Sequence, residues 1–134
     1  MPKVKDKIVI QKNIIIAEFM GGEPANKVKD NPIAYIFPFE FGHQETWDEF
    51  GFQGSGASSC WDIGDLQYHL SWDWIIPVYQ KIMKGYYGTT IMEISNEENH
   101  LLEQIKTHLS QTDIKNLHNW IYEFIKWYNE NKKD

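Results

Sequence analysis

The sequence predicts an α+β fold in which a short sheet is packed by two main helices. Two segments alternate like strands, 33–37 and 89–94, and two longer segments carry apolar residues at helical spacing, near 72–84 and 113–130. A chain of 134 residues, of which 42% are apolar, is large enough to build one core. We therefore expect residues 1–134 to form a single domain.

The first elements expected along the chain are a short helix and a strand. Residues 1–12 resemble a lysine-rich arm, after which Asn13 is a suitable cap for a short apolar helix ended by Gly21-Gly22. A polar loop leads to the segment IAYIF at 33–37. This segment alternates and is rich in β-favouring residues, so it predicts the first strand.

An unusual segment, rich in glycine and aromatic residues, follows at about 39–70. No period holds within it, and loops of this length are uncommon in a compact domain unless they are functional or disordered. Disordered segments are poor in rings, whereas this one contains several: Trp47, Phe50, Phe52, Trp61 and Tyr68. We predict an ordered insertion.

The next element is a helix over about 72–84, with Ser71 as its N-cap and Gly85 just after its end. Pro77 lies in its second turn, where it removes a backbone hydrogen bond and predicts a kink near Asp73. The predicted core-facing residues follow a three-or-four spacing: Trp72, Ile75, Ile76, Tyr79 and Met83. Tyr68 and Trp74 fall off this stripe.

Two further helices are expected in the last third of the chain. The segment LLEQIKTHL at 101–109 has helical spacing, and residues 113–130 carry a continuous apolar face. That face includes Phe124, and we expect it to pack on the sheet.

Charge and cysteine content exclude several classes of function. The net charge is −6, all 13 basic residues are lysines, and none lies between Lys29 and Lys81. A chain without arginine or a basic stripe is poorly suited to binding nucleic acid directly. The lone Cys60 cannot form an internal disulfide, and no leader or long apolar span is present, so we expect no membrane association and a cytoplasmic protein.

The glycine segment and the rings around it predict a ligand pocket. Backbone amides and hydroxyls of residues 51–59 could surround an anion while rings stack on a base, although a surface loop explains the same residues. The segment lacks the ending of a phosphate-binding P-loop. The predicted ligand-binding residues are Trp47, Phe52, Ser55, Trp61, Tyr68, His69 and Trp74.

The candidate catalytic and metal-binding residues also have ordinary structural interpretations. His69 and Asp73 are conceivable metal ligands together with His43, Asp62 and Asp65, but their spacing matches no standard signature. Cys60 would need an adjacent base to act as a nucleophile. We therefore predict no catalytic residue, no metal ligand and no cofactor.

Three sequence blocks stand out in order along the chain: Asn13 to Gly21, the segment SWDWIIPV from Ser71 to Val78, and FIKWYN from Phe124 to Asn129. Together they resemble blocks found in a group of small phage and prophage proteins. The resemblance implies an α-β-α sandwich-like domain and a protein encoded by a phage or mobile element. No catalytic residue follows from it. It also implies a role outside virion assembly, such as counter-defence.

These observations lead to one expected function and two alternatives. We expect a non-enzymatic phage accessory protein that sequesters a small, nucleotide-derived host defence signal. The first alternative is an acidic protein that inhibits a basic host defence protein by docking or by nucleic-acid mimicry. The second is a metal-dependent enzyme that degrades a nucleotide. Homo-oligomerisation is left open by the sequence.

Overall fold

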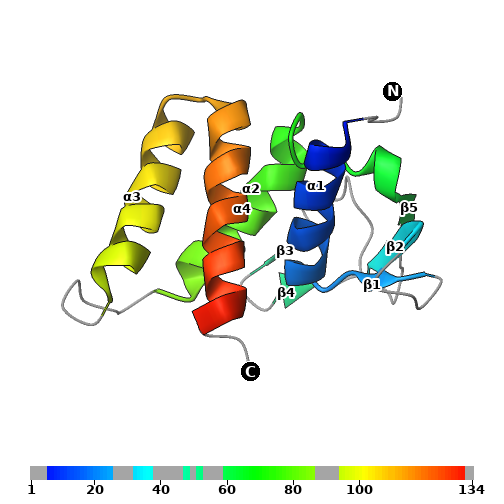
Figure 1. The fold of residues 1–134 in the computed structure, drawn as a ribbon, viewed down its shortest axis with the longest axis horizontal. Helices are drawn as coiled ribbons and strands as arrows, with labels where there is room; N and C mark the ends of the chain where they lie inside the picture. The colour runs from blue at the N-terminus through cyan, green and yellow to red at the C-terminus, as the bar shows by residue number, and fades with distance from the viewer. Residues whose placement is uncertain are drawn as a thin grey trace. The chain divides into compact units, whose positions relative to one another are not determined.

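The computed structural model describes residues 6–25, 32–37, 47–48, 51–52, 59–86 and 94–131 (Figure 1). In this part of the chain it contains four α-helices and a small three-stranded antiparallel sheet, which confirms the α+β class. The chain divides into two compact units, Met1–Leu66 and Gln67–Asp134, and the boundary falls inside the predicted insertion. The single-domain expectation stays a prediction, as does the packing of helices from the second unit on the sheet.

Helix α1, Lys7–Phe19, opens the first unit and begins earlier than predicted. Asp6 is its N-cap, because a carboxylate oxygen accepts the backbone N–H of Ile8 at 2.9 Å. The prediction that Asn13 caps this helix is wrong. Asn13 lies inside the helix, fully buried, and its Nδ2 donates to the carbonyl oxygen of Leu66 at 3.1 Å.

The end of α1 follows the glycine pattern that the sequence predicts. Gly21 has a φ of +93°, a left-handed conformation that costs glycine little. Its N–H donates to the Glu18 carbonyl, and the N–H of Gly22 donates to the Ala17 carbonyl. These two bonds form a Schellman motif, which satisfies the last carbonyls of the helix.

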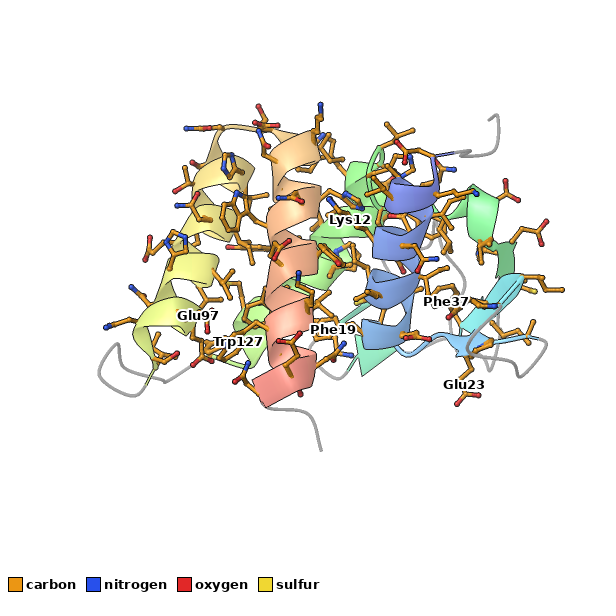
Figure 2. The ribbon with its side chains drawn as sticks, in the orientation of Figure 1. Lys12, Phe19, Glu23, Phe37, Glu97 and Trp127 are labelled. Atoms are coloured by element: carbon orange, nitrogen blue, oxygen red, sulfur yellow. The ribbon has the colours of Figure 1, made fainter. Side chains whose placement is uncertain are left out.

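The sheet of the first unit contains β1 (Glu23–Pro24), β2 (Ala34–Phe37) and β5 (Ser59–Asp62), in the order β1-β2-β5. The predicted strand at 33–37 is thus confirmed as β2. Tyr35 and Phe37 are fully buried, and Phe37 lies on the side of β2 toward α1 (Figure 2). A Cβ added to Gly22, just after α1, would approach the Phe37 ring to 2.8 Å. Glycine therefore allows the chain to pass close to this core ring.

The predicted insertion contains short regular elements within its described residues. β3 (Trp47–Asp48) pairs antiparallel with β4 (Gly51–Phe52), and a 3₁₀ turn, η2 (Ile63–Asp65), follows β5 and contacts α1. The insertion therefore supplies the third strand of the sheet and a turn that packs on the first helix. Its other residues, including 53–58, lie outside the described part of the chain.

Helix α2, Trp72–Lys84, begins the helical part of the second unit and matches the predicted bounds. Ser71 occupies the N-cap position, although its side chain makes no capping hydrogen bond, and Gly85 occupies the C-cap position. Pro77 lies inside the helix as expected. The predicted strand at 89–94 falls almost entirely outside the described residues, and Ile94 itself is a bend.

Helices α3 (Asn96–Ser110) and α4 (Ile114–Asn131) form a closely packed hairpin beside α2 (Figure 1). Ser95 caps α3 by accepting the N–H of Glu98. The Glu98 carboxylate is buried and accepts a hydrogen bond from the Tyr86 hydroxyl. Phe124 is buried on α4, which confirms the predicted apolar face. Among the described helices, none is long and apolar enough to cross a membrane.

Candidate functional site

The two rings predicted to wall a ligand pocket lie in the core of the second unit. Tyr68 is fully buried and Trp74 is 7% exposed, and their rings meet edge to face with centroids 5.1 Å apart. Burial raises the pKa of the Tyr68 hydroxyl well above its ordinary value, since an anion there would lose its hydration. The prediction that these rings lie off the core face is wrong.

The correction follows from the rotational phase of α2. The buried residues of this helix are Trp74, Ile75, Pro77, Val78 and Ile82, whereas Trp72, Ile76, Tyr79 and Met83 are half-buried. Because tryptophan occurs at both 72 and 74, the sequence pattern is compatible with two rotational phases of the helix, one that buries Trp72 and one that buries Trp74. The edge-to-face contact with Tyr68, in the turn before the helix, favours the phase that buries Trp74.

The remaining predicted ligand-binding residues divide between the two units. Trp47 and Phe52 are opposite each other in the β3–β4 pair, but their side chains and all of Ser55 lie outside the described part of the chain. Trp61 is half-buried on β5, opposite Tyr35 of β2. His69 is half-buried in the turn before α2. The structure therefore brings Tyr68 and Trp74 together as a core pair, and the grouping of all seven residues in one site stays a prediction.

A row of exposed residues crosses the sheet of the first unit instead. Glu23 of β1 is paired with Ile36 of β2, and Ile36 is paired with Cys60 of β5. All three side chains are exposed, and 43% of Ile36 is accessible to solvent although its neighbours Tyr35 and Phe37 are fully buried. Glu23 points away from the ribbon in Figure 2. Because side chains alternate along a strand, this row defines the outer face of the sheet.

Acidic and apolar groups are combined on this face. Asp62, two residues beyond Cys60 on β5, is exposed. We call Glu23, Ile36, Cys60 and Asp62 the outer sheet face. The outer sheet face therefore combines one exposed isoleucine with exposed carboxylates on two strands.

The outer sheet face was missed because it depends on strand register. The sequence indicated β2. The alternation of IAYIF also indicated that Ile36 lies on the opposite face of the strand from Tyr35 and Phe37. Nothing in the local pattern showed that Glu23 and Cys60 pair with the same residue. The register between distant segments brings these three together.

A second feature is a pair of neighbouring histidine rings, one of which, His118, was not among the candidates from the sequence. The ring of His69 lies 5.8 Å, centroid to centroid, from the ring of His118 on α4. His118 is buried. His69 is partly buried, and its own burial lowers the pKa of its imidazole, since the charged form would lose hydration. His118 follows Leu117 and precedes Ile121 on the apolar face of α4, so the helical period was the signal for its burial.

The candidate metal ligands and the candidate thiol nucleophile are only partly described by the structure. No group of three or more histidine, cysteine, aspartate or glutamate side chains with metal-binding geometry occurs among the described residues. Asp73 is exposed on the first turn of α2, and His43 lies outside the described residues. Cys60 is exposed on the outer sheet face.

Comparison with known proteins adds no relative to this picture. No protein-family model, curated protein sequence or solved structure matches the chain.

Proposed function

We propose that this protein is a non-enzymatic interaction protein that docks its outer sheet face on a basic protein surface. The observation that carries the proposal is the exposed row Glu23, Ile36 and Cys60, continued by Asp62. Ile36 offers apolar area at the centre of the face, where burial contributes most to binding energy. The carboxylates at the margin of the outer sheet face favour a positively charged partner.

The charge distribution of the chain supports a basic partner. Eight acidic residues and no lysine lie between positions 30 and 80, the interval that contains β2 and β5. A surface of one sign attracts the opposite sign during diffusion, which raises the association rate and makes it sensitive to salt. A basic host protein satisfies this requirement, whereas phosphate-bearing ligands would meet repulsion from the same carboxylates.

The biological role that we attach to this docking is phage counter-defence in the host cytoplasm. The three sequence blocks that resemble phage and prophage proteins support it. Nucleases and other nucleic-acid-binding defence proteins carry basic surfaces. An acidic face that covers such a surface would compete with the nucleic acid, which is how inhibition by mimicry works.

The single cysteine provides a direct test. Cys60 is the only thiol in the chain and is exposed, so a photoactivatable crosslinker attached there reports on contacts of the outer sheet face without any mutation. We expect irradiation in extracts of defence-positive cells to capture one host protein with a basic surface. Ile36→Lys should reduce capture about tenfold or more, because it places a buried, like-signed charge against the partner. Capture should also fall as salt increases.

Ile8→Lys provides the matched control. Ile8 is also an exposed isoleucine of the first unit, with 67% of its surface accessible, but it lies on α1 and not on the sheet. This variant should capture the partner like the wild type and should protect phage plating equally in defence-positive cells. Equal capture by Ile36→Lys and wild-type protein would count against the outer sheet face.

We propose sequestration of a small nucleotide-derived molecule as the second candidate, because Trp61 on β5 is only half-buried. A base stacked on an aromatic ring gains about 1–3 kcal/mol. Titration with a panel of cyclic and linear nucleotides, followed by tryptophan fluorescence, tests this candidate. Binding that is lost in Trp61→Leu and kept in Ile36→Lys would favour the small ligand over the docking surface.

A further inference from the structure

Strand β5 lies at one edge of the sheet in the first unit. In the order β1-β2-β5 it pairs with β2 alone within the part of the chain that the structure describes. An edge strand carries backbone N–H and C=O groups that point away from its neighbour and can pair with another chain. The hydrogen-bond phase of the sheet decides which residues of β5 present these groups.

A hydrogen bond at the end of the β2–β5 ladder fixes this phase. The N–H of Ile63 donates to the Ile33 carbonyl at 3.1 Å, and these two residues continue the register of the two strands. In an antiparallel ladder, hydrogen-bonded and non-hydrogen-bonded pairs alternate. The pair of Cys60 and Ile36 lies three positions further along, so it is a non-hydrogen-bonded pair. The backbone N–H and C=O of Cys60 therefore point to the outer edge of β5.

The opposite edge of the sheet is poorly suited to pairing. The N–H of Ala25 donates to the Ala34 carbonyl at 2.9 Å, and by the same alternation the backbone of Pro24 faces the outer edge of β1. Proline has no N–H to offer, and β1 has only two residues. Strand β5 has four residues and presents the N–H of Cys60, so it is the edge that can accept another strand.

We propose that an extended basic segment of the partner protein adds to the three-stranded sheet beside β5. Main-chain hydrogen bonds to Cys60 would hold the segment, as in recognition by β-strand addition. Because side chains alternate along a strand, every second side chain of the segment would lie on the outer sheet face, near the exposed Asp62 carboxylate. Lysine or arginine fits that position. This inference rests on the proposed function and states how the basic partner is held.

The charge of this edge favours a basic partner over a second copy of the chain. Pairing between two β5 strands would bring the Asp62 carboxylates of both copies toward each other, and like charges on neighbouring strands destabilise a sheet. No lysine lies between Lys29 and Lys81 to compensate them. A basic segment would instead bring the opposite charge to the same edge.

Amide hydrogen exchange with a defined peptide tests strand addition. In the free protein the Cys60 amide should exchange at least about tenfold faster than the Trp61 amide, which the alternation places in a hydrogen bond to Tyr35. The probe is a peptide of alternating lysine and valine with blocked ends. We expect it to slow exchange of the Cys60 amide about tenfold or more. A peptide with glutamate in place of lysine should leave that rate unchanged.

Cys60→Pro removes the N–H that an added strand needs and takes no hydrogen bond from the ladder with β2. It should weaken binding of the lysine–valine peptide about tenfold or more. Cys60→Val is the matched control, because it changes the same side chain and keeps the N–H, and it should bind the peptide like the wild type. Circular dichroism checks the folding of both variants. If Cys60→Pro fails to fold, exchange of the wild-type Cys60 amide decides the question.

The possible outcomes distinguish this inference from the proposed function. Peptide binding that is lost in Ile36→Lys and kept in Cys60→Pro would overturn strand addition and leave the outer sheet face in place. Binding that is unchanged in both variants would count against both. Absence of peptide binding to the wild type, or slow exchange of Cys60 in the free protein, would overturn strand addition alone. A wild-type dimer that dissociates in Cys60→Pro would assign the edge to a second copy and overturn the basic segment.

Discussion

The Tyr35 hydroxyl on β2 donates a hydrogen bond to a carboxylate oxygen of Glu18 on α1, at 2.8 Å. This bond ties the first helix to the central strand of the sheet within the first unit. The Tyr35 ring is fully buried, and its burial, together with the neighbouring Glu18 carboxylate, raises the pKa of its hydroxyl well above 10.0. The native state therefore favours the protonated hydroxyl.

Tyr35→Phe should lower the free energy of unfolding by about 1–2 kcal/mol at pH 7, because it removes a hydrogen bond to a charged acceptor. The same variant should change the alkaline response. A tyrosine whose pKa is raised in the native state stabilises fully below its unfolded pKa of 10.0, and this contribution disappears as the pH rises above that value.

Urea denaturation at pH 7 and at pH 11 measures both effects. The loss of stability between the two pH values should be smaller in Tyr35→Phe than in the wild type. It should not vanish, because the pKa values of Tyr68 and Tyr86 are raised as well. An unchanged difference would show that Tyr35 ionises equally easily in both states.

A second prediction concerns the ends of two helices. The end of α3 repeats the hydrogen bonds found at the end of α1, since the N–H of Thr112 donates to Leu109 and that of Asp113 donates to His108. Here the left-handed position is Thr112, with a φ of 53°. A β-branched residue is strained in this conformation, whereas glycine is not.

Thr112→Gly should therefore raise the free energy of unfolding by about 1 kcal/mol, since relief of the backbone strain exceeds the entropy that glycine adds to the unfolded chain. Gly21→Ala is the converse variant. No heavy atom lies within 4 Å of the new Cβ, so its cost would come from the positive φ alone. Thermal denaturation of both variants should show shifts of opposite sign, and a stability loss in Thr112→Gly would contradict the strain.

The sequence allowed accurate prediction of elements whose signals are local. The alternation of IAYIF identified β2, and helical spacing bounded by Ser71 and Gly85 identified α2. The start of α1 was missed because Asp6 and Asn13 are both suitable caps, and only the first makes the capping hydrogen bond. Asn13 is a polar residue inside an apolar helix, and its hydrogen-bond partner is the distant Leu66 carbonyl. Because the sequence does not reveal that partner, Asn13 resembled a helix cap.

Features that depend on contacts between elements were beyond the sequence. The outer sheet face requires the register of three strands, and the histidine pair requires the packing of α4 beside the turn that precedes α2. The phase of α2 was wrong for a related reason. With tryptophan at positions 72 and 74, periodicity alone does not decide which ring is buried.

The buried amide of Asn13 gives a third prediction. Its Nδ2 donates to the Leu66 carbonyl, which lies directly after η2, so the bond holds the turn against α1. Asn13→Ala should lower the free energy of unfolding by about 1–3 kcal/mol, because it leaves a buried carbonyl without its donor. Gln11→Ala, at an exposed position of the same helix, should change stability by less than about 0.5 kcal/mol. Chemical denaturation of both variants provides the comparison, and equal stabilities would refute the role of the Asn13 amide.

The last prediction separates the two tryptophans at the start of α2. Trp74 is 7% exposed and packs edge to face on the fully buried Tyr68, whereas Trp72 is half-buried. Trp74→Ala should lower the free energy of unfolding by about 3–5 kcal/mol, since it removes a large buried ring and leaves a cavity beside Tyr68. Trp72→Ala should cost clearly less, because Trp72 is only half-buried. The two variants remove the same atoms two residues apart, so the difference in their denaturation midpoints reports directly on the phase of the helix. A larger loss in Trp72→Ala would restore the phase expected from the sequence and would return Trp74 to the list of residues available to a ligand.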